Sequence, residues 1–150
     1  MKRHLLFQAQ VGAVFAVAIV PGKWGFVRFF RGLSMGILSI VRDSPEMPNV
    51  DWKNPPVEWV FFSFAPDGDA TQVVKLGTVP FDDDEAAWAP PCFYPPDELQ
   101  ACYKIHERGT IRKTTAANDV RGMAECRTLT PARLADFLRE RLASGELELV

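Results

Sequence analysis

The sequence holds few of the side chains with which enzymes carry out acid–base and nucleophilic chemistry. Its 150 residues include two histidines and three cysteines. It also lacks a glycine-rich phosphate loop, a Gly-x-Ser-x-Gly elbow and a His-Glu-x-x-His motif. These absences argue against a nucleotide-dependent enzyme, a serine hydrolase and a zinc protease. We therefore expect a protein that is not an enzyme and that uses neither a cofactor nor a metal.

The chain also lacks a strong overall charge and a long apolar run. Its net charge is −2, so the molecule as a whole should attract neither nucleic acid nor an anionic membrane. No apolar run approaches the roughly 18–20 residues that a membrane-spanning helix needs. We expect a protein partner, and neither a nucleic acid nor a membrane.

Cysteine usage and the N-terminus both favour the cytoplasm. Cys92, Cys102 and Cys126 are odd in number and no two are closely spaced, which argues against a disulfide framework or a zinc site. We expect all three to be reduced thiols. The stretch Ala16–Ala18 is similar to a signal-peptidase site, but two glutamines interrupt the apolar region before it. Cleavage there would also remove a strand that the next turn needs.

Apolar runs separated by glycine and proline predict β-strands joined by short turns. The first three runs predict a meander. The fourth and fifth flank Pro66–Asp69, whose proline and glycine are typical of a hairpin turn, and a further hairpin is predicted about Arg108 and Gly109. Small side chains on the second face of the first run suggest a strand covered on both sides or one in a curved barrel wall. The predicted strands are Val11–Val20, Trp24–Phe30, Met35–Val41, Val57–Phe64, Gln72–Leu76, Ala101–His106 and Thr110–Thr115.

One helix is predicted near the C-terminus. Thr130 is a suitable N-cap, Pro131 suits the first helical position, and Gly145 is the expected stop. An apolar stripe with helical spacing lies between them, formed by Leu134, Phe137, Leu138 and Leu142. We predict a single domain over residues 1–150 of the mainly β (α+β) class. Its form is a strongly bent antiparallel sheet or small barrel of six to eight strands, with one C-terminal α-helix.

The densest charge in the chain is an acidic run in its middle third. Four consecutive carboxylates repel one another and are either solvated, bound to a basic partner or bound to a metal. The alternating oxygen ligands of a calcium loop are missing, and an aromatic residue close to a charge cluster is typical of interface hot spots. The residues predicted to bind a protein partner are Asp82, Asp83, Asp84, Glu85 and Trp88.

Two other functions are compatible with the residues. A small-ligand site would be an aromatic pocket between strands, lined by Trp24, Phe26, Trp59 and Phe61. An enzyme would use Cys92 or His106, although a lone strand histidine is more often a surface residue than a base.

Several segments together resemble a family of bacterial immunity proteins. Residues 10–17, followed by the Gly-Lys-Trp-Gly-Phe-Val-Arg segment at 22–28, are similar to the opening hairpin of the immunity protein 26 type, which accompanies polymorphic toxins. Residues 76–81 and the proline-rich segment 90–96 resemble its middle region. Arg28 departs from the family pattern, which has glycine or a small residue there. The resemblance implies a cytoplasmic, non-enzymatic protein that binds and neutralises a cognate toxin, and a nuclease toxin would be basic because its substrate is a polyanion.

Overall fold

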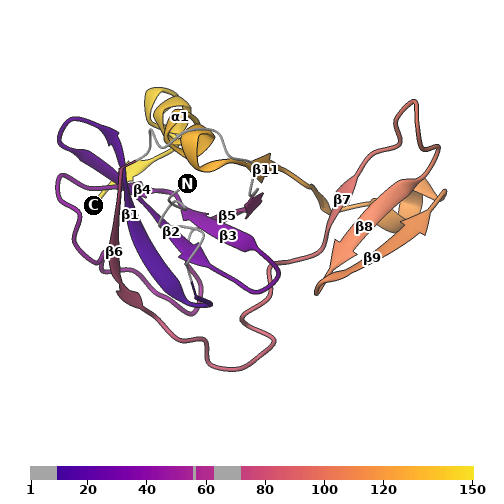
Figure 1. Ribbon diagram of the computed structural model, residues 1–150, viewed down its shortest axis with the longest axis horizontal. Coiled ribbons are helices and arrows are strands. Elements are labelled where there is room, and N and C mark those ends of the chain that lie inside the picture. The colour runs from indigo at the N-terminus through magenta and orange to yellow at the C-terminus, as the bar shows by residue number, and fades with distance from the viewer. Residues whose placement is uncertain (1–9, 56, 63–71) are drawn as a thin grey trace, which may run out of the picture.

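A computed structural model describes residues 10–55, 57–62 and 72–150, and its strands form two lobes (Figure 1). The larger lobe is built on a six-stranded sheet with the order β11-β5-β3-β2-β1-β6. All of its pairs are antiparallel except β11 with β5. Its strands are β1 (Ala13–Val20), β2 (Lys23–Phe29), β3 (Ser34–Leu38), β5 (Val57–Phe62), β6 (Val73–Thr78) and β11 (Thr128–Leu129).

The smaller lobe is a four-stranded sheet with the order β10-β7-β8-β9. It contains β7 (Cys92–Tyr94), β8 (Tyr103–Glu107), β9 (Thr110–Thr114), the 3-10 helix η2 (Ala117–Val120) and β10 (Ala124–Glu125). The larger lobe also carries helix α1 and a short parallel pair of strands. These elements are α1 (Pro131–Ala143), β4 (Ile40–Val41) and β12 (Glu148–Leu149).

The prediction of a mainly β fold with one C-terminal helix is confirmed. The large sheet ends at β11 and β6, so the described strands form an open sheet and not a closed barrel. The predicted hairpin between the fourth and fifth runs is wrong, because β5 pairs with β3 whereas β6 pairs with β1 at the opposite edge. The turn predicted at Pro66–Asp69 lies outside the described residues.

Strand β1 has an apolar core on both of its faces, which is one of the two arrangements that its small side chains predicted. Phe15 points into a cluster that includes Leu138 of α1. Ala16, on the other face, belongs to a second cluster with Phe26, against which Trp52 of the long β4–β5 loop packs. The loop therefore covers the face of the sheet that is opposite to the helix.

The helix begins and ends where the sequence predicted, but it is not capped as expected. Gly145 follows it in the left-handed region at φ 76°. The Thr130 side chain makes no capping hydrogen bond, and its buried hydroxyl has no hydrogen-bond partner in the described part of the chain. Close packing of the helix on the sheet depends on Gly25, because a Cβ atom there would lie 3.0 Å from Leu138 Cδ1.

The most unusual core residue is Arg28, whose exposed fraction is 1%. Its Nη2 atom donates hydrogen bonds to the Val79 carbonyl at 2.7 Å and to the Pro80 carbonyl at 3.1 Å. Its Nη1 atom donates to the Trp52 carbonyl at 3.2 Å. The guanidinium carbon lies 3.8 Å from the centre of the Phe81 ring, a cation–π contact that is stronger when it is desolvated.

Arg28 joins three segments that are far apart in the sequence. The carbonyls that it binds belong to the β4–β5 loop and to the segment that leaves β6 for the smaller lobe. Burial lowers the pKa of Arg28, and the negative charge of Asp82 opposes this effect. The group remains charged, since an arginine pKa lies far above neutral pH.

Arg28→Ala should lower the free energy of unfolding by about 3 kcal/mol or more, because three carbonyls lose their donor and a cavity forms. Arg28→Lys should lie between this variant and the wild type, since lysine keeps the charge but not the planar fork. Urea denaturation measures both values. Arg42→Ala is the matched control, because Arg42 also binds a loop carbonyl, that of Met47, but at the surface. A loss for Arg28→Ala no larger than for this control would contradict the anchoring role.

Candidate partner-binding cleft

A cleft with a volume of about 1010 Å³ lies between the two lobes. The larger lobe contributes Val57–Phe61 of β5 and the turn Arg31–Ser34. The smaller lobe contributes Cys92, His106–Gly109 and Met123–Arg127, and the connecting segment contributes Trp88–Pro91. The cleft is therefore bounded by both lobes and by the segment that links them.

Apolar side chains are exposed on opposite walls of the cleft. Trp59 of β5 has an exposed fraction of 38%, and Ile111 of β9 has one of 60%. Trp59 stacks edge to face on Phe30 with 6.0 Å between ring centres, so its position is fixed by packing. Fixed aromatic side chains of this kind are typical anchors for a bound partner.

His106 lies on the small-lobe wall between two aromatic rings. Its ring centre is 5.3 Å from that of Phe61 and 5.1 Å from that of Tyr94. Burial lowers the pKa of His106 below its ordinary value of 6.5, and the positive charge of Lys104 lowers it further. No carboxylate among the described residues is hydrogen-bonded to the imidazole, and its neighbours are aromatic rings, so its surroundings are those of a packed wall residue.

The lowered pKa predicts that the protein is less stable in acid. Near pH 6.5 the unfolded chain binds a proton at this position that the folded chain does not, so the free energy of unfolding rises with pH. The contribution of His106 to the free energy of unfolding is complete above the pKa that this residue has in the unfolded chain. It is lost as the pH falls from that value through the lower pKa of the folded protein. Urea denaturation between about pH 5 and 8 should show this slope, and His106→Gln should reduce it. An identical slope in the variant would contradict the prediction.

A disulfide joins Cys92 to Cys126, so the prediction that all three cysteines are reduced thiols is wrong. The two residues are 34 positions apart, but β7 and β10 are neighbours in the small sheet, which brings their Cα atoms to 5.1 Å. Cys102 is the remaining free thiol. In this bonded form Cys92 has no thiol with which to act as a nucleophile.

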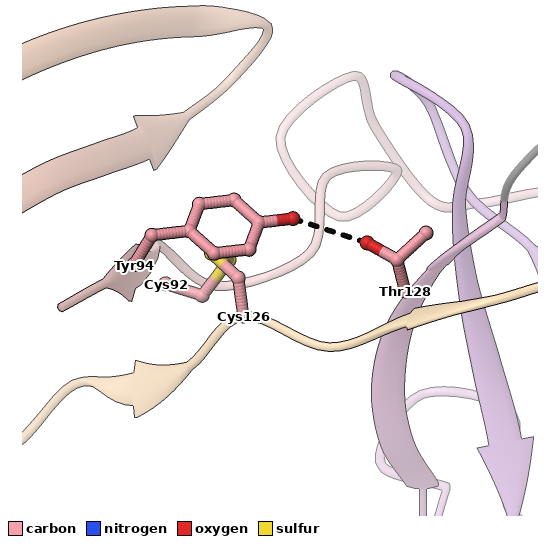
Figure 2. The surroundings of a disulfide bond; sticks show 4 residues. All are labelled: Cys92, Tyr94, Cys126 and Thr128. Carbon is pink, nitrogen blue, oxygen red and sulfur yellow. Dashed lines mark hydrogen bonds between the residues drawn. A yellow bond between two sulfur atoms is a disulfide. The ribbon is translucent and has the colours of Figure 1, made fainter. Parts of the chain in front are cut away.

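The disulfide closes the neck of the smaller lobe. It joins the first residue of β7 to the residue that follows β10 (Figure 2). Beside it, the Tyr94 hydroxyl reaches the Thr128 hydroxyl of β11 at 3.0 Å, so a hydrogen bond links β7 to the large sheet. Both contacts fix the end of the lobe that borders the cleft.

Cys92→Ser combined with Cys126→Ser should lower the free energy of unfolding by about 3–4 kcal/mol, the chain-entropy estimate for a loop of this length. Urea denaturation measures the loss, and Cys102→Ser serves as the control with little expected change. Alkylation of the denatured protein should label one thiol without reductant and three with it. Three labelled thiols without reductant would contradict the disulfide.

The acidic run at residues 82–85, called the acidic rim below, does not line the cleft itself, but two of its four members pair with arginines that do. Asp84 binds Arg31 at 2.7 Å, and Glu85 binds Arg108 at 3.0 Å. Arg31 follows β2 in the larger lobe, whereas Arg108 lies in the β8–β9 turn of the smaller one. Each pair is exposed and contributes little energy alone, but together they tie the connecting segment to both lobes.

Trp88 reinforces the same connection by packing between two turns. A Cβ atom on Gly32 would lie 3.1 Å from Trp88 Cζ3, and one on Gly109 would lie 3.5 Å from Trp88 Cη2. Both glycines have positive φ angles, 69° and 78°. The predicted partner residues are thus brought together, but Trp88 is a half-buried spacer between the lobes that also lines the cleft.

The four aromatic residues predicted to line a ligand pocket do not meet in one place. Trp59 and Phe61 line the cleft. Phe26 is buried in the second core cluster, and Trp24 packs against that cluster. Sequence reasoning missed Arg31, Arg108 and Ile111. Ile111 could have been identified from the sequence, since it is the single apolar residue in an otherwise polar strand.

In comparisons with known proteins, no family model, no curated protein and no solved structure matches this chain. None of the helices within the described ranges is long and apolar enough to cross a membrane. In the same ranges, no three histidine, cysteine or carboxylate side chains gather as metal ligands would.

Proposed function

We propose that this protein is a binding protein of the toxin-immunity type, which receives a segment of a partner protein in the cleft between its lobes. The observation that carries the proposal is the exposure of Trp59 and Ile111 on opposite walls of that cleft. A bound segment would remove both side chains from water, which is favourable in proportion to the apolar area covered. The resemblance to the immunity protein 26 type supports a toxin as the partner.

The acidic rim supports a partner that is basic. Asp84 and Glu85 are paired with arginines, whereas no ion pair to Asp82 or Asp83 is found among the described residues. These two carboxylates therefore leave a local negative charge beside the cleft. Such a charge speeds the association of a basic partner more than it strengthens the final complex.

The cytoplasm remains part of this proposal because the resemblance implies it. The observation against it is the disulfide, since cytosolic proteins usually keep their thiols reduced.

The proposal is tested with toxin domains encoded beside this chain. A host that produces such a domain should grow only when this protein is also produced. In calorimetry with the purified domain, Trp59→Ala should weaken binding roughly 30-fold or more, as expected for a hot-spot residue. Leu99→Ala is the control, because Leu99 has an exposed fraction of 94% and does not line the cleft. Equal affinities for the two variants would contradict cleft binding.

The acidic rim is tested in the same complex by its association rate. Asp82→Asn with Asp83→Asn removes two charges and leaves both interlobe ion pairs in place. Association at low salt should be several-fold slower and less dependent on salt. Glu140→Gln with Glu148→Gln removes the same charge away from the cleft and should change the rate much less. Equal rates for the two double variants would exclude the acidic rim as a steering surface.

A further inference from the structure

Strand β5 presents part of its backbone edge to the cleft. On one side β5 pairs with β3, in the register Met35 to Val60 and Ile37 to Glu58. On the other side the Phe61 amide donates to the Arg127 carbonyl at 2.7 Å. Because successive residues of a strand direct their backbone groups to alternate sides, the amide and carbonyl groups of Trp59 and Val57 point away from β3, as those of Phe61 do.

Only the end of this outer edge is covered. Strand β11 pairs with β5 at Phe61 and Phe62. From Val57 to Val60, no backbone partner on the outer side is found in the part of the chain that the structure describes. All four of these residues line the cleft. An unpaired strand edge is a template for the backbone of another chain.

We infer that an extended segment of the partner adds to β5 as a further strand, in line with β11 and within the cleft. The inference rests on the proposed function and specifies its mode of recognition. An extended peptide is the occupant whose own amides and carbonyls match the outward groups of Val57 and Trp59. Strand β11 already binds the same edge in this way over two residues.

The side chains of β5 define what such a segment carries. Trp59 and Phe61 lie on one face of the strand, where Trp59 meets Phe30 and Phe61 meets His106. Alternate residues of the segment that fall on this face should be apolar or aromatic. On the other face Glu58 is held by Arg127 and Arg141 at 3.1 and 3.0 Å, so residues there should be polar.

Few of the devices that normally protect a strand edge are present here. The one charged side chain between Val57 and Val60 is that of Glu58, and its two arginine partners hold it in place. What stands opposite the edge is the smaller lobe, including Ala124 and Glu125 of β10. The edge thus lies inside the cleft, between the large sheet and the smaller lobe.

The test uses peptides selected on the full-length protein from a displayed random-sequence library. For a selected peptide, hydrogen exchange of the Trp59 amide should slow at least tenfold on binding. The Phe61 amide is an internal control, because it is already bonded to Arg127 and should change little. N-methylation of those alternate peptide amides that face β5 should weaken binding about fivefold per amide, and methylation of the others should not, since one hydrogen bond contributes roughly 1 kcal/mol.

The outcomes separate the inference from the proposed function. Two results together support both the inference and the proposed function: slower exchange of the Trp59 amide, and a loss of affinity only when the peptide amides that face β5 are methylated. Peptides that lose affinity for Trp59→Ala, but that neither protect the Trp59 amide nor respond to N-methylation, overturn strand addition and leave cleft binding intact. A library that yields no peptide sensitive to Trp59→Ala overturns the proposed function itself.

Discussion

The arrangement of the molecule depends on one buried cation. Arg28 points from the middle of β2 into the core, where no carboxylate of the described residues is bonded to it and three backbone carbonyls accept hydrogen bonds from Nη1 and Nη2, while Nε is left without a partner among those residues. A buried charge is costly unless it is hydrogen-bonded, so losing any of these carbonyls would raise that cost and the segments that supply them must keep their places. One of them continues through Phe81 into the acidic run and Trp88. The position of the cleft rim is therefore determined partly inside the core of the larger lobe.

The relation between the two lobes is set by several weak contacts and one covalent bond. Each surface ion pair of the connecting segment contributes little by itself. Trp88 also fixes the spacing of the lobes, because its ring packs so closely on the Gly32 turn that a Cβ atom there would lie at 3.1 Å, and it is in van der Waals range of the Gly109 turn on the other side. The disulfide makes the smaller lobe a closed loop. Together these contacts hold the cleft open without filling it.

The sequence predicted the local elements well and the long-range contacts poorly. The meander of β1 to β3, the β8–β9 hairpin and the C-terminal helix follow from apolar periodicity and turn residues, which act over a few positions. The partner of β6 could not be predicted in this way, because adjacency in sequence favoured β5 whereas the sheet places β6 beside β1. The disulfide was missed for the same reason, since its two cysteines become neighbours only when β7 and β10 pair.

The candidate site also combines local features that the sequence indicates with long-range contacts that it does not. The acidic run and Trp88 were identified from composition, but their arginine partners come from turns more than twenty residues away in the sequence. Arg28 was noted as a departure from a family pattern, and only the packing reveals why a large charged side chain fits there. An arginine within an otherwise apolar strand is a usable signal, because burial obliges distant backbone to bind it.

The cleft and the free edge of β5 have a common origin. The chain leaves the smaller lobe through Cys126 and Arg127 and joins the large sheet as β11, but it pairs with β5 over only two residues. A longer β11 would cover Trp59 and would also draw the smaller lobe against β5, closing the cleft. The disulfide prevents this, because it holds Cys126 beside β7 and so limits how far back along β5 the returning chain can pair. The same bond that closes the small lobe thus keeps a strand edge available within the cleft.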